Sequence, residues 1–174
     1  MEYLVSKRLV HRDLAARNIL LIESHNAKIS DFGLCCSCDD TSLSYQASLE
    51  KKLPMRWLSL EALLLRTFSE KSDVWSFGIL MYEIFSGGKL PYATMEADRI
   101  VEFLKSGKRM ECPENASDEV YEIMCSCWEE NVETRISFSE LSTKFRTILF
   151  RETQDYGYIC GEEQEEQNSN TLKL

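Results

Sequence analysis

The segment His11-Arg12-Asp13-Leu14-Ala15-Ala16-Arg17-Asn18 is followed, after a short apolar run, by Asp31-Phe32-Gly33. The residues between them read as two short strands that turn back at Ser24-His25-Asn26. Such a hairpin brings Asp31 beside Asn18, and an amide held next to a carboxylate supplies hard oxygen ligands that suit Mg²⁺. Asp13 is a separate acid that can orient an attacking hydroxyl group and accept its proton. The two segments therefore predict a proton acceptor next to a magnesium site.

Both segments, in this order and at this spacing, resemble the catalytic loop and the Asp-Phe-Gly motif of protein kinases. Ala15 stands where serine/threonine kinases carry a lysine, and the positive charge lies instead at Arg17, as in tyrosine kinases. Within that group the sequence is most similar to receptor tyrosine kinases. The resemblance implies a mainly α-helical fold, namely a kinase-like C-terminal lobe with a short β-hairpin at the catalytic site.

The resemblance also implies ATP and Mg²⁺ as cofactors. Asp13 would be the catalytic base, and Arg17 would position both Asp13 and the incoming phenol. Asn18 and Asp31 would hold Mg²⁺, and Leu20 would form the floor under the adenine.

Four further residues of the two motifs are implied to have structural roles. His11 and Phe32 are expected to pack inward and to align the metal-binding aspartate over a central helix. Arg12 and Gly33 complete the two motifs.

The first eight residues are interpreted as the last turns of a helix that precedes the catalytic loop. The Gly-rich phosphate loop and the nucleotide-binding lysine of a kinase N-terminal lobe are not found in the sequence. We therefore expect residues 1–152 to be a partial kinase domain, the C-terminal lobe only. We expect little or no activity from the chain alone, because half of the phosphate-binding cradle is missing.

After Gly33, a polar stretch without periodicity predicts a mobile loop. Tyr45 lies in it where receptor kinases carry an activation-loop tyrosine, and a phosphate there could be held by Arg12. The alternative is an exposed tyrosine without a regulatory role. Cys35, Cys36 and Cys38 raise the question of a zinc site, but a fourth ligand at workable spacing is missing, which favours ordinary or redox-sensitive thiols.

The segment Leu53-Pro54-Met55-Arg56-Trp57 matches the part of tyrosine kinases that supports the substrate tyrosine, with Pro54 as a flat apolar surface. Glu61 follows, and Arg135 is its expected partner in a buried bidentate salt bridge. An ordinary surface ion pair is the alternative.

Residues 72–85 form the most apolar helix candidate, with Ser72 as the expected N-cap. By resemblance this is the central helix of the lobe, and Asp73 would accept backbone hydrogen bonds near His11 and Arg12. Alternatively, Asp73 only interacts with the helix dipole. Further helices are expected over 96–106, from 120 to 127, and from a capping box at 137–140.

The 174 residues carry a net charge of −9, which argues against nucleic acid as a partner. No apolar run reaches the length of a membrane span, and seven cysteines without framework spacing favour a reducing compartment. Residues 153–174 are expected to be an acidic, disordered tail in which Tyr156 or Tyr158 could bind SH2-type readers of phosphotyrosine. The expected location is the cytoplasmic side of the plasma membrane for a receptor, or the cytoplasm for a free fragment.

The function that the resemblance implies is ATP-dependent phosphorylation of tyrosine residues in protein substrates. The alternative is a non-catalytic kinase lobe that acts as a scaffold or as a dominant-negative fragment.

Overall fold

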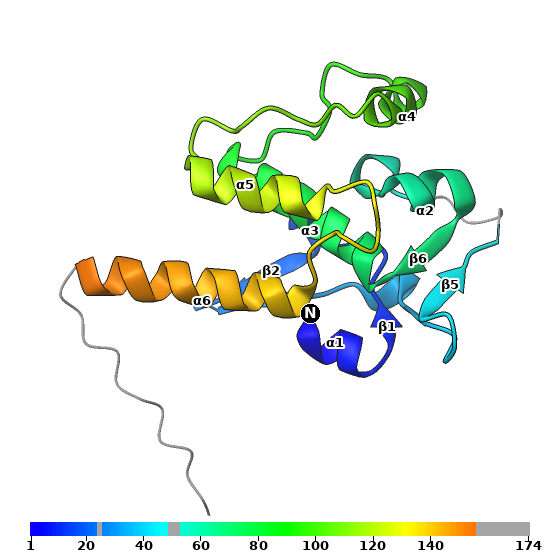
Figure 1. Ribbon diagram of the computed structural model, residues 1–174, viewed down its shortest axis with the longest axis horizontal. Helices are drawn as coiled ribbons and strands as arrows, with labels where there is room; N and C mark the ends of the chain where they lie inside the picture. The colour runs from blue at the N-terminus through cyan, green and yellow to red at the C-terminus, as the bar shows by residue number, and fades with distance from the viewer. Residues whose placement is uncertain (24–25, 49–52, 156–174) are drawn as a thin grey trace, which may run out of the picture. The chain divides into compact units, whose positions relative to one another are not determined.

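The computed structural model describes residues 1–23, 26–48 and 53–155 (Figure 1). It divides into one compact unit, Met1–Leu141, and a second unit that begins at Ser142. In chain order its elements are α1 Glu2–Ser6, β1 Leu9–Val10, η1 Ala16–Asn18, β2 Ile19–Ile22, β3 Asn26–Ile29, η2 Phe32–Leu34, β4 Cys36–Ser37, β5 Ser44–Gln46, η3 Met55–Trp57, α2 Leu60–Leu65, β6 Thr67–Ser69, α3 Glu70–Phe85, α4 Ala97–Lys105, α5 Asp118–Cys127 and α6 Phe138–Asp155. The described part is mainly helical, with three small two-stranded sheets.

Helix α3 is the core element of the first unit. It contacts β1, η1, η3, β6 and α5, and Val74, Trp75 and Ile79 on it are fully buried. The contact with α5 is especially close at Gly78, where an added Cβ would lie 2.6 Å from Nε1 of Trp128. Only a residue without a side chain fits there, so Gly78 sets how closely α5 packs against α3.

The start of α3 differs from the prediction. The helix begins at Glu70, and its N-cap is Ser69 rather than Ser72. Ser72 occupies the third helical position, where its hydroxyl accepts from the backbone N–H of Ser69 at 3.0 Å. The two serines thus form a capping box, a motif whose third position is usually Glu or Gln and was therefore not recognised in the sequence.

The hairpin after the catalytic loop is present. Strands β2 and β3 pair antiparallel, with Ile19 opposite Ile29 and Ile22 opposite Asn26. Ser24 and His25, which were expected in the turn, lie outside the described residues. This register returns the chain to Asn18 just before Asp31.

The polar segment after Gly33 is more regular than predicted. Strand β4 pairs with β1, and β5 pairs with β6 so that Tyr45 lies opposite Phe68. Cys36, Cys38 and Tyr45 pack against a core cluster built on Val10, Leu58, Ala62 and Phe68. The prediction of an irregular stretch was wrong at these two strands, because the residues that pair with them are distant in sequence.

The C-terminal helices largely follow the predicted stripes. Helices α4 and α5 occupy the expected regions, and the short helix α2 was not predicted. The Ser137–Glu140 capping box opens α6, with the Glu140 carboxylate accepting from the Ser137 N–H at 2.8 Å. Helix α6 continues to Asp155, so the first three residues of the expected tail are helical. Tyr156 and Tyr158 lie outside the described residues.

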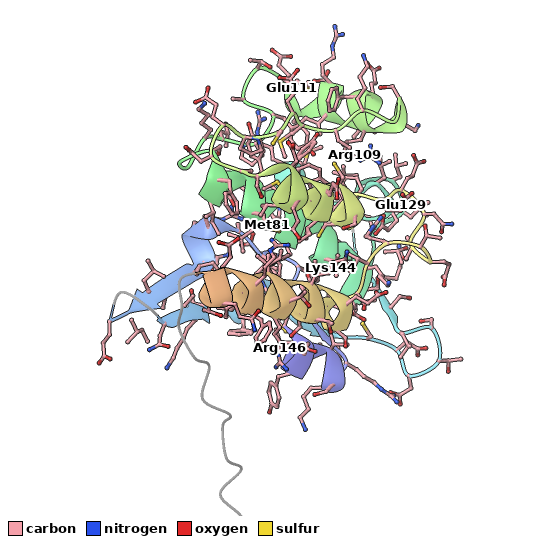
Figure 2. All side chains as sticks on the ribbon, turned by 60° about the vertical axis from the view of Figure 1, so that its left-hand side comes forward. Met81, Arg109, Glu111, Glu129, Lys144 and Arg146 are labelled. Carbon is pink, nitrogen blue, oxygen red and sulfur yellow. The ribbon has the colours of Figure 1, made fainter. Side chains whose placement is uncertain are left out.

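Two arginines enclose the buried Trp75. The guanidinium carbons of Arg109 and Arg135 lie 4.9 and 5.0 Å from its ring centroid, and Arg109, labelled in Figure 2, donates from Nε to the Trp128 carbonyl oxygen at 2.7 Å. These contacts join the loops after α4 and α5 to the core helix. Among the described helices, none has both the length and the apolar character that crossing a membrane requires.

Candidate active site

The loop that carries Asp13 is attached to α3 by one carboxylate. Asp73 accepts from the backbone N–H of His11 at 2.7 Å and from that of Arg12 at 2.9 Å, each with a different oxygen. Burial raises the pKa of Asp73 to about 7, and the two backbone donors oppose that rise. Asp73 therefore does more than interact with the helix dipole, because it holds two consecutive peptide groups of the loop.

His11 is fully buried, and its hydrogen bonds fix one neutral tautomer. Its Nε2 lies 3.1 Å from the carbonyl oxygen of Ser30, which requires Nε2 to donate. Its Nδ1 accepts from the backbone N–H of Asp13 at 3.3 Å. Burial lowers the pKa of His11, while the carboxylates of Asp13 and Asp31 act in the opposite direction. Both acids thus lie close enough to interact with this ring, which connects the two motifs.

The carboxylate of Asp13 is oriented by two neighbours. Arg17 forms a salt bridge with its Oδ1. Nδ2 of Asn18 donates to Oδ2 of Asp13 at 3.0 Å and to its backbone carbonyl oxygen at 2.7 Å. The sequence predicted that Asp13, Arg17 and Asn18 would work together, and the structure brings them together.

Asp31 is brought to Asn18 through its preceding residue. Ser30 donates from its backbone N–H and from Oγ to the carbonyl oxygen of Asn18, at 2.8 and 2.9 Å. Asp31 itself has a φ of 59°, and one carboxylate oxygen accepts from the Gly33 N–H at 3.2 Å. A non-glycine residue in the left-handed region, held there by a hydrogen bond within its own loop, is often found at functional sites.

This donor set fits a hard cation. The amide nitrogen of Asn18 is used by Asp13, which leaves its carbonyl oxygen as the ligand atom. Asp31 adds an exposed carboxylate. A carbonyl oxygen with a carboxylate oxygen is the chemistry that Mg²⁺ prefers.

The apolar residues above this site are exposed. Leu20 is 55% and Phe32 49% exposed. The ring of Phe32 meets His11 edge-on at 5.1 Å between centroids. Phe32 therefore contacts His11 but does not pack fully inward as predicted, because about half of it is exposed.

Arg12 lies beneath Tyr45. The guanidinium carbon of Arg12 is 4.9 Å from the ring centroid of Tyr45 and 4.4 Å from that of Phe68. Its Nη1 lies 3.4 Å from the Leu34 carbonyl oxygen, and Nε and Nη2 have no hydrogen-bond partner in the described part of the chain. Two donors of a buried cation thus remain unused next to the tyrosine.

The segment expected to support the substrate lies beside the catalytic loop. Pro54 precedes η3 and is partly buried. The ring of Trp57 lies 4.3 Å from the guanidinium carbon of Arg17. The structure therefore places this segment against the residue that pairs with Asp13.

Glu61 and Arg135 form the expected bidentate pair. Nη1 and Nη2 of Arg135 donate to the two carboxylate oxygens at 2.7 and 3.1 Å, and the Arg135 side chain is fully buried. Nη1 also donates to the Lys71 carbonyl oxygen and Nε to that of Glu129, each at 2.8 Å. An ordinary surface ion pair does not describe this geometry.

The three clustered cysteines, Cys35, Cys36 and Cys38, are all partly buried. Burial raises the pKa of all three thiols, that of Cys38 to about 11, so they are protonated at neutral pH. No group of three or more His, Cys, Asp or Glu side chains that could hold a metal was found in the described residues.

Sequence reasoning missed one residue of this site, Glu83 on α3. It is only 9% exposed, and one of its oxygens accepts from the Ala16 N–H and from the indole N–H of Trp57, both at 2.9 Å. The available signal was a carboxylate within an otherwise apolar helix, which burial makes costly unless it is hydrogen-bonded.

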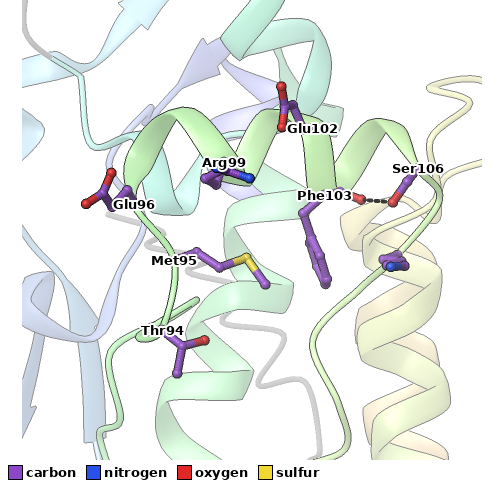
Figure 3. A pocket seen from close by; sticks show the side chains of 8 residues that line it. Thr94, Met95, Glu96, Arg99, Glu102, Phe103 and Ser106 are labelled. Atoms are coloured by element: carbon purple, nitrogen blue, oxygen red, sulfur yellow. Dashed lines mark hydrogen bonds between the residues drawn. The ribbon is translucent and has the colours of Figure 1, made fainter.

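A separate pocket lies along α4 (Figure 3). Its volume is about 690 Å³, and none of the predicted site residues lines it. Phe103 and Met95 are among the lining residues, together with charged side chains of both signs. It is an open surface hollow, distinct from the catalytic loop.

A carboxylate paired with an arginine, close in the chain to an amide and a second carboxylate whose oxygens suit Mg²⁺, is the kind of arrangement found at sites that transfer phosphoryl groups. Residues 1–145 match the family model described as protein tyrosine and serine/threonine kinase. The chain belongs to this protein kinase family.

Its relatives are tyrosine kinases. The chain is 44% identical over 164 residues to the putative tyrosine-protein kinase F09A5.2 of Caenorhabditis elegans, covering 94% of this chain and 19% of that protein. It is 44% identical over 150 residues to the tyrosine-protein kinase SYK of Gallus gallus (86% and 24%). It is also 43% identical over 157 residues to a fibroblast growth factor receptor of Strongylocentrotus purpuratus (90% and 16%). The chain thus spans between about a sixth and a quarter of the length of these relatives.

Proposed function

We propose that this chain is the C-terminal lobe of a protein-tyrosine kinase of the receptor type. In this proposal it supplies the substrate-activating half of a site that phosphorylates tyrosine in protein substrates. The observation that carries the proposal is the oriented Asp13, whose carboxylate contacts Arg17 and Asn18 at once. Ala15 in place of a lysine and the Trp57 ring beside Arg17 support tyrosine over serine or threonine as the acceptor.

Each residue has a stated task in this proposal. Asp13 accepts a hydrogen bond from the tyrosine hydroxyl and takes its proton as the oxygen attacks the γ-phosphorus of ATP. Arg17 pairs with the Asp13 carboxylate and directs it toward the phenol. Pro54 and Trp57 line the path of the substrate, and Leu20 supports the adenine. The phosphoryl group leaves ADP and forms the phosphate ester.

Asn18 and Asp31 would hold Mg²⁺ through one carbonyl and one carboxylate oxygen. When bound, the ion supplies positive charge that offsets the charge of the ATP phosphates. The chain contributes the direction of these ligands, since Ser30 bonds to Asn18 and Gly33 to Asp31.

Tyr45 is proposed as a regulatory site. A phosphate on it would carry a charge of about −2 and would lie near Arg12, whose Nε and Nη2 have no other partner in the described residues. Forming these charge-assisted bonds requires Tyr45 to leave its position over the guanidinium. Tyr45→Phe keeps the ring contact and removes the acceptor hydroxyl, so it should prevent this activation while leaving the fold intact.

The test joins this chain to a kinase N-terminal lobe and measures phosphorylation of a Glu/Tyr polymer with Mg-ATP. Asp13→Asn keeps the shape of the side chain but removes the base, and general-base catalysis is worth roughly 10²–10⁴-fold. We expect a loss of that size. Asp118→Asn, in the exposed first turn of α5, is the matched control and should retain full activity.

Equal activity of Asp13→Asn and Asp118→Asn would remove Asp13 from the role of base. If the unsubstituted protein has no kinase activity, the non-catalytic scaffold or dominant-negative lobe becomes the better reading, and SH2-type binding at Tyr156 or Tyr158 becomes the next property to test.

A further inference from the structure

Glu83 connects two parts of the site that are far apart in sequence. One of its carboxylate oxygens, Oε2, accepts from the Ala16 N–H in the catalytic loop and from the Nε1–H of Trp57, the last residue of the substrate segment, both at 2.9 Å. The side chain comes from α3, the core element, and is almost completely buried. A buried carboxylate oxygen that accepts from two donors is a rigid reference point.

Both contacts lead to Arg17. Ala16 directly precedes Arg17, so the bond to its N–H fixes the backbone from which the Arg17 side chain starts. Trp57 provides the surface on which the guanidinium rests, 4.3 Å from ring centroid to guanidinium carbon. The guanidinium then pairs with Asp13. Arg17 is thus fixed at its backbone and at its tip by groups that bond to a single oxygen atom.

This arrangement has consequences beyond packing. The side chain of Arg17 is partly exposed, and an exposed arginine ordinarily samples many rotamers. A cation over an indole face gains attraction from the ring. The Glu83–Trp57 bond sets the tilt of that indole, and hence the direction from which Arg17 reaches Asp13.

We infer that Glu83 and Trp57 are positioning residues which hold Arg17 beside Asp13. The rate of phosphoryl transfer to a tyrosine hydroxyl then depends on the single Glu83 oxygen to which Ala16 and Trp57 both donate. This inference rests on the proposed function and deepens it. It assigns Trp57 a task in catalysis through its N–H group, in addition to lining the substrate path.

The first test compares Glu83→Gln with Glu83→Leu in the protein that carries an N-terminal lobe. Gln keeps a carbonyl oxygen that can accept both bonds, whereas Leu keeps only the volume. Because hydrogen bonds to charged groups contribute about 1.5–3 kcal/mol, we expect kcat to fall about tenfold or more for Leu. We expect Gln to recover most of that loss and the KM for ATP to change little. Trp57→Phe keeps a ring but removes the donor, and it should resemble Leu.

A double-mutant cycle separates positioning from simple support of the fold. If Glu83 acts through Arg17, adding Glu83→Leu to Arg17→Ala should lower kcat by less than about twofold more. Ser76→Ala is the matched control, because Ser76 on the same helix donates to the backbone carbonyl oxygen of Trp57 at 2.8 Å and not to its side chain. Its effect should be additive with Arg17→Ala. Additive effects for Glu83→Leu would overturn the inference.

A second readout uses the chain alone and does not depend on activity. Among the three tryptophans, the indole N–H groups of Trp75 and Trp128 have no partner in the described residues, whereas that of Trp57 is bonded to Glu83. We expect the Trp57 indole proton to resonate downfield and to exchange slowly, assigned by its absence in Trp57→Phe. Glu83→Leu should shift it and broaden the Arg17 Nε–H signal.

The two tests fail in different ways. A wild-type protein without kinase activity contradicts the proposed function, while the resonances of Trp57 and Arg17 still decide whether Glu83 sets their geometry. An active protein whose Glu83→Leu variant matches the wild type in kcat contradicts only the inference. Unchanged indole and Arg17 signals in that variant overturn it as well.

Discussion

The underside of the catalytic loop and the face above it are built differently. Below, α3 supplies Asp73 and Glu83, which hold the backbone of His11, Arg12 and Ala16 with buried carboxylates. On the hairpin and after it, Leu20 and Phe32 are exposed side chains without such support. In the proposed function, the half of the site that activates the acceptor hydroxyl is therefore held by buried groups, whereas the half that would receive the nucleotide carries exposed apolar side chains.

The largest expected effect concerns the buried salt bridge between Arg135 and Glu61. Arg135→Met removes the cation of the pair with Glu61 and leaves a carboxylate and several carbonyl oxygens without their donor. Breaking a buried pair from one side costs about 3–5 kcal/mol, which is what urea unfolding should show. The control is Arg8→Met, whose pair with Asp40 is exposed. A similarly small change in the free energy of unfolding for both variants would show that the Arg135–Glu61 pair contributes less to stability than its geometry indicates.

An effect of intermediate size concerns the protonation of His11. Its lowered pKa means that the stability it provides is complete above the unfolded value of about 6.5 and is lost as pH falls through the lower folded value. Protonation would also place a second N–H at Nδ1, against the N–H of Asp13. A titration of the His11 ring by NMR should give a midpoint below about 6.5. A midpoint above that value would mean that Asp13 and Asp31 outweigh burial.

Asp73 has the opposite pH dependence. Because its folded pKa is raised to about 7, its contribution to stability is complete below about pH 4 and is lost as pH rises through 7. The pH dependence of unfolding therefore combines the opposite contributions of His11 and Asp73. The NMR titration of the His11 ring measures the His11 contribution separately.

The smallest effect on stability is expected at Leu21, an exposed residue of strand β2. Leu21 is 72% exposed, so Leu21→Ser should change the free energy of unfolding by less than about 0.5 kcal/mol. It should also reduce self-association measured by light scattering, since it shrinks the apolar surface. Leu14→Ala, at a buried position of the catalytic loop, should cost about 2–5 kcal/mol. A large loss of stability in Leu21→Ser would show that this face is packed in solution.

The parts of the site that could be predicted are those in which chemistry and spacing coincide. Asp13, Arg17 and Asn18 lie in one short loop, and the hairpin register that brings Asp31 back follows from the apolar residues between the motifs. The bonds of Asp73 to the catalytic loop were predicted from the resemblance of its helix to the central helix of a kinase lobe. These features depend on local sequence and on one resemblance.

The remaining features depend on contacts between distant segments. The pairing of β5 with β6 is not visible in the polar sequence around Tyr45, because its partner lies beyond the substrate segment. The sequence predicted Ser72 as the N-cap of α3, whereas the structure has Ser69 there. Both serines are plausible caps, and only the structure shows that the Ser69 N–H bonds to the Ser72 hydroxyl and the Lys71 N–H to the Ser69 hydroxyl. The role of Glu83 required the positions of Ala16 and Trp57 together.

The backbone of Arg12 has a φ of 68°, a left-handed conformation that costs an ordinary residue about 1–2 kcal/mol. It persists because Asp73 grips the peptide N–H groups on both sides of the Cα of His11, the residue before it. Helix α3 thus maintains the bend directly before Asp13. In the proposed mechanism the direction of the Asp13 carboxylate depends on this bend, so Arg12→Gly, which opens many other backbone conformations, should loosen that direction although no atom of Asp13 has changed.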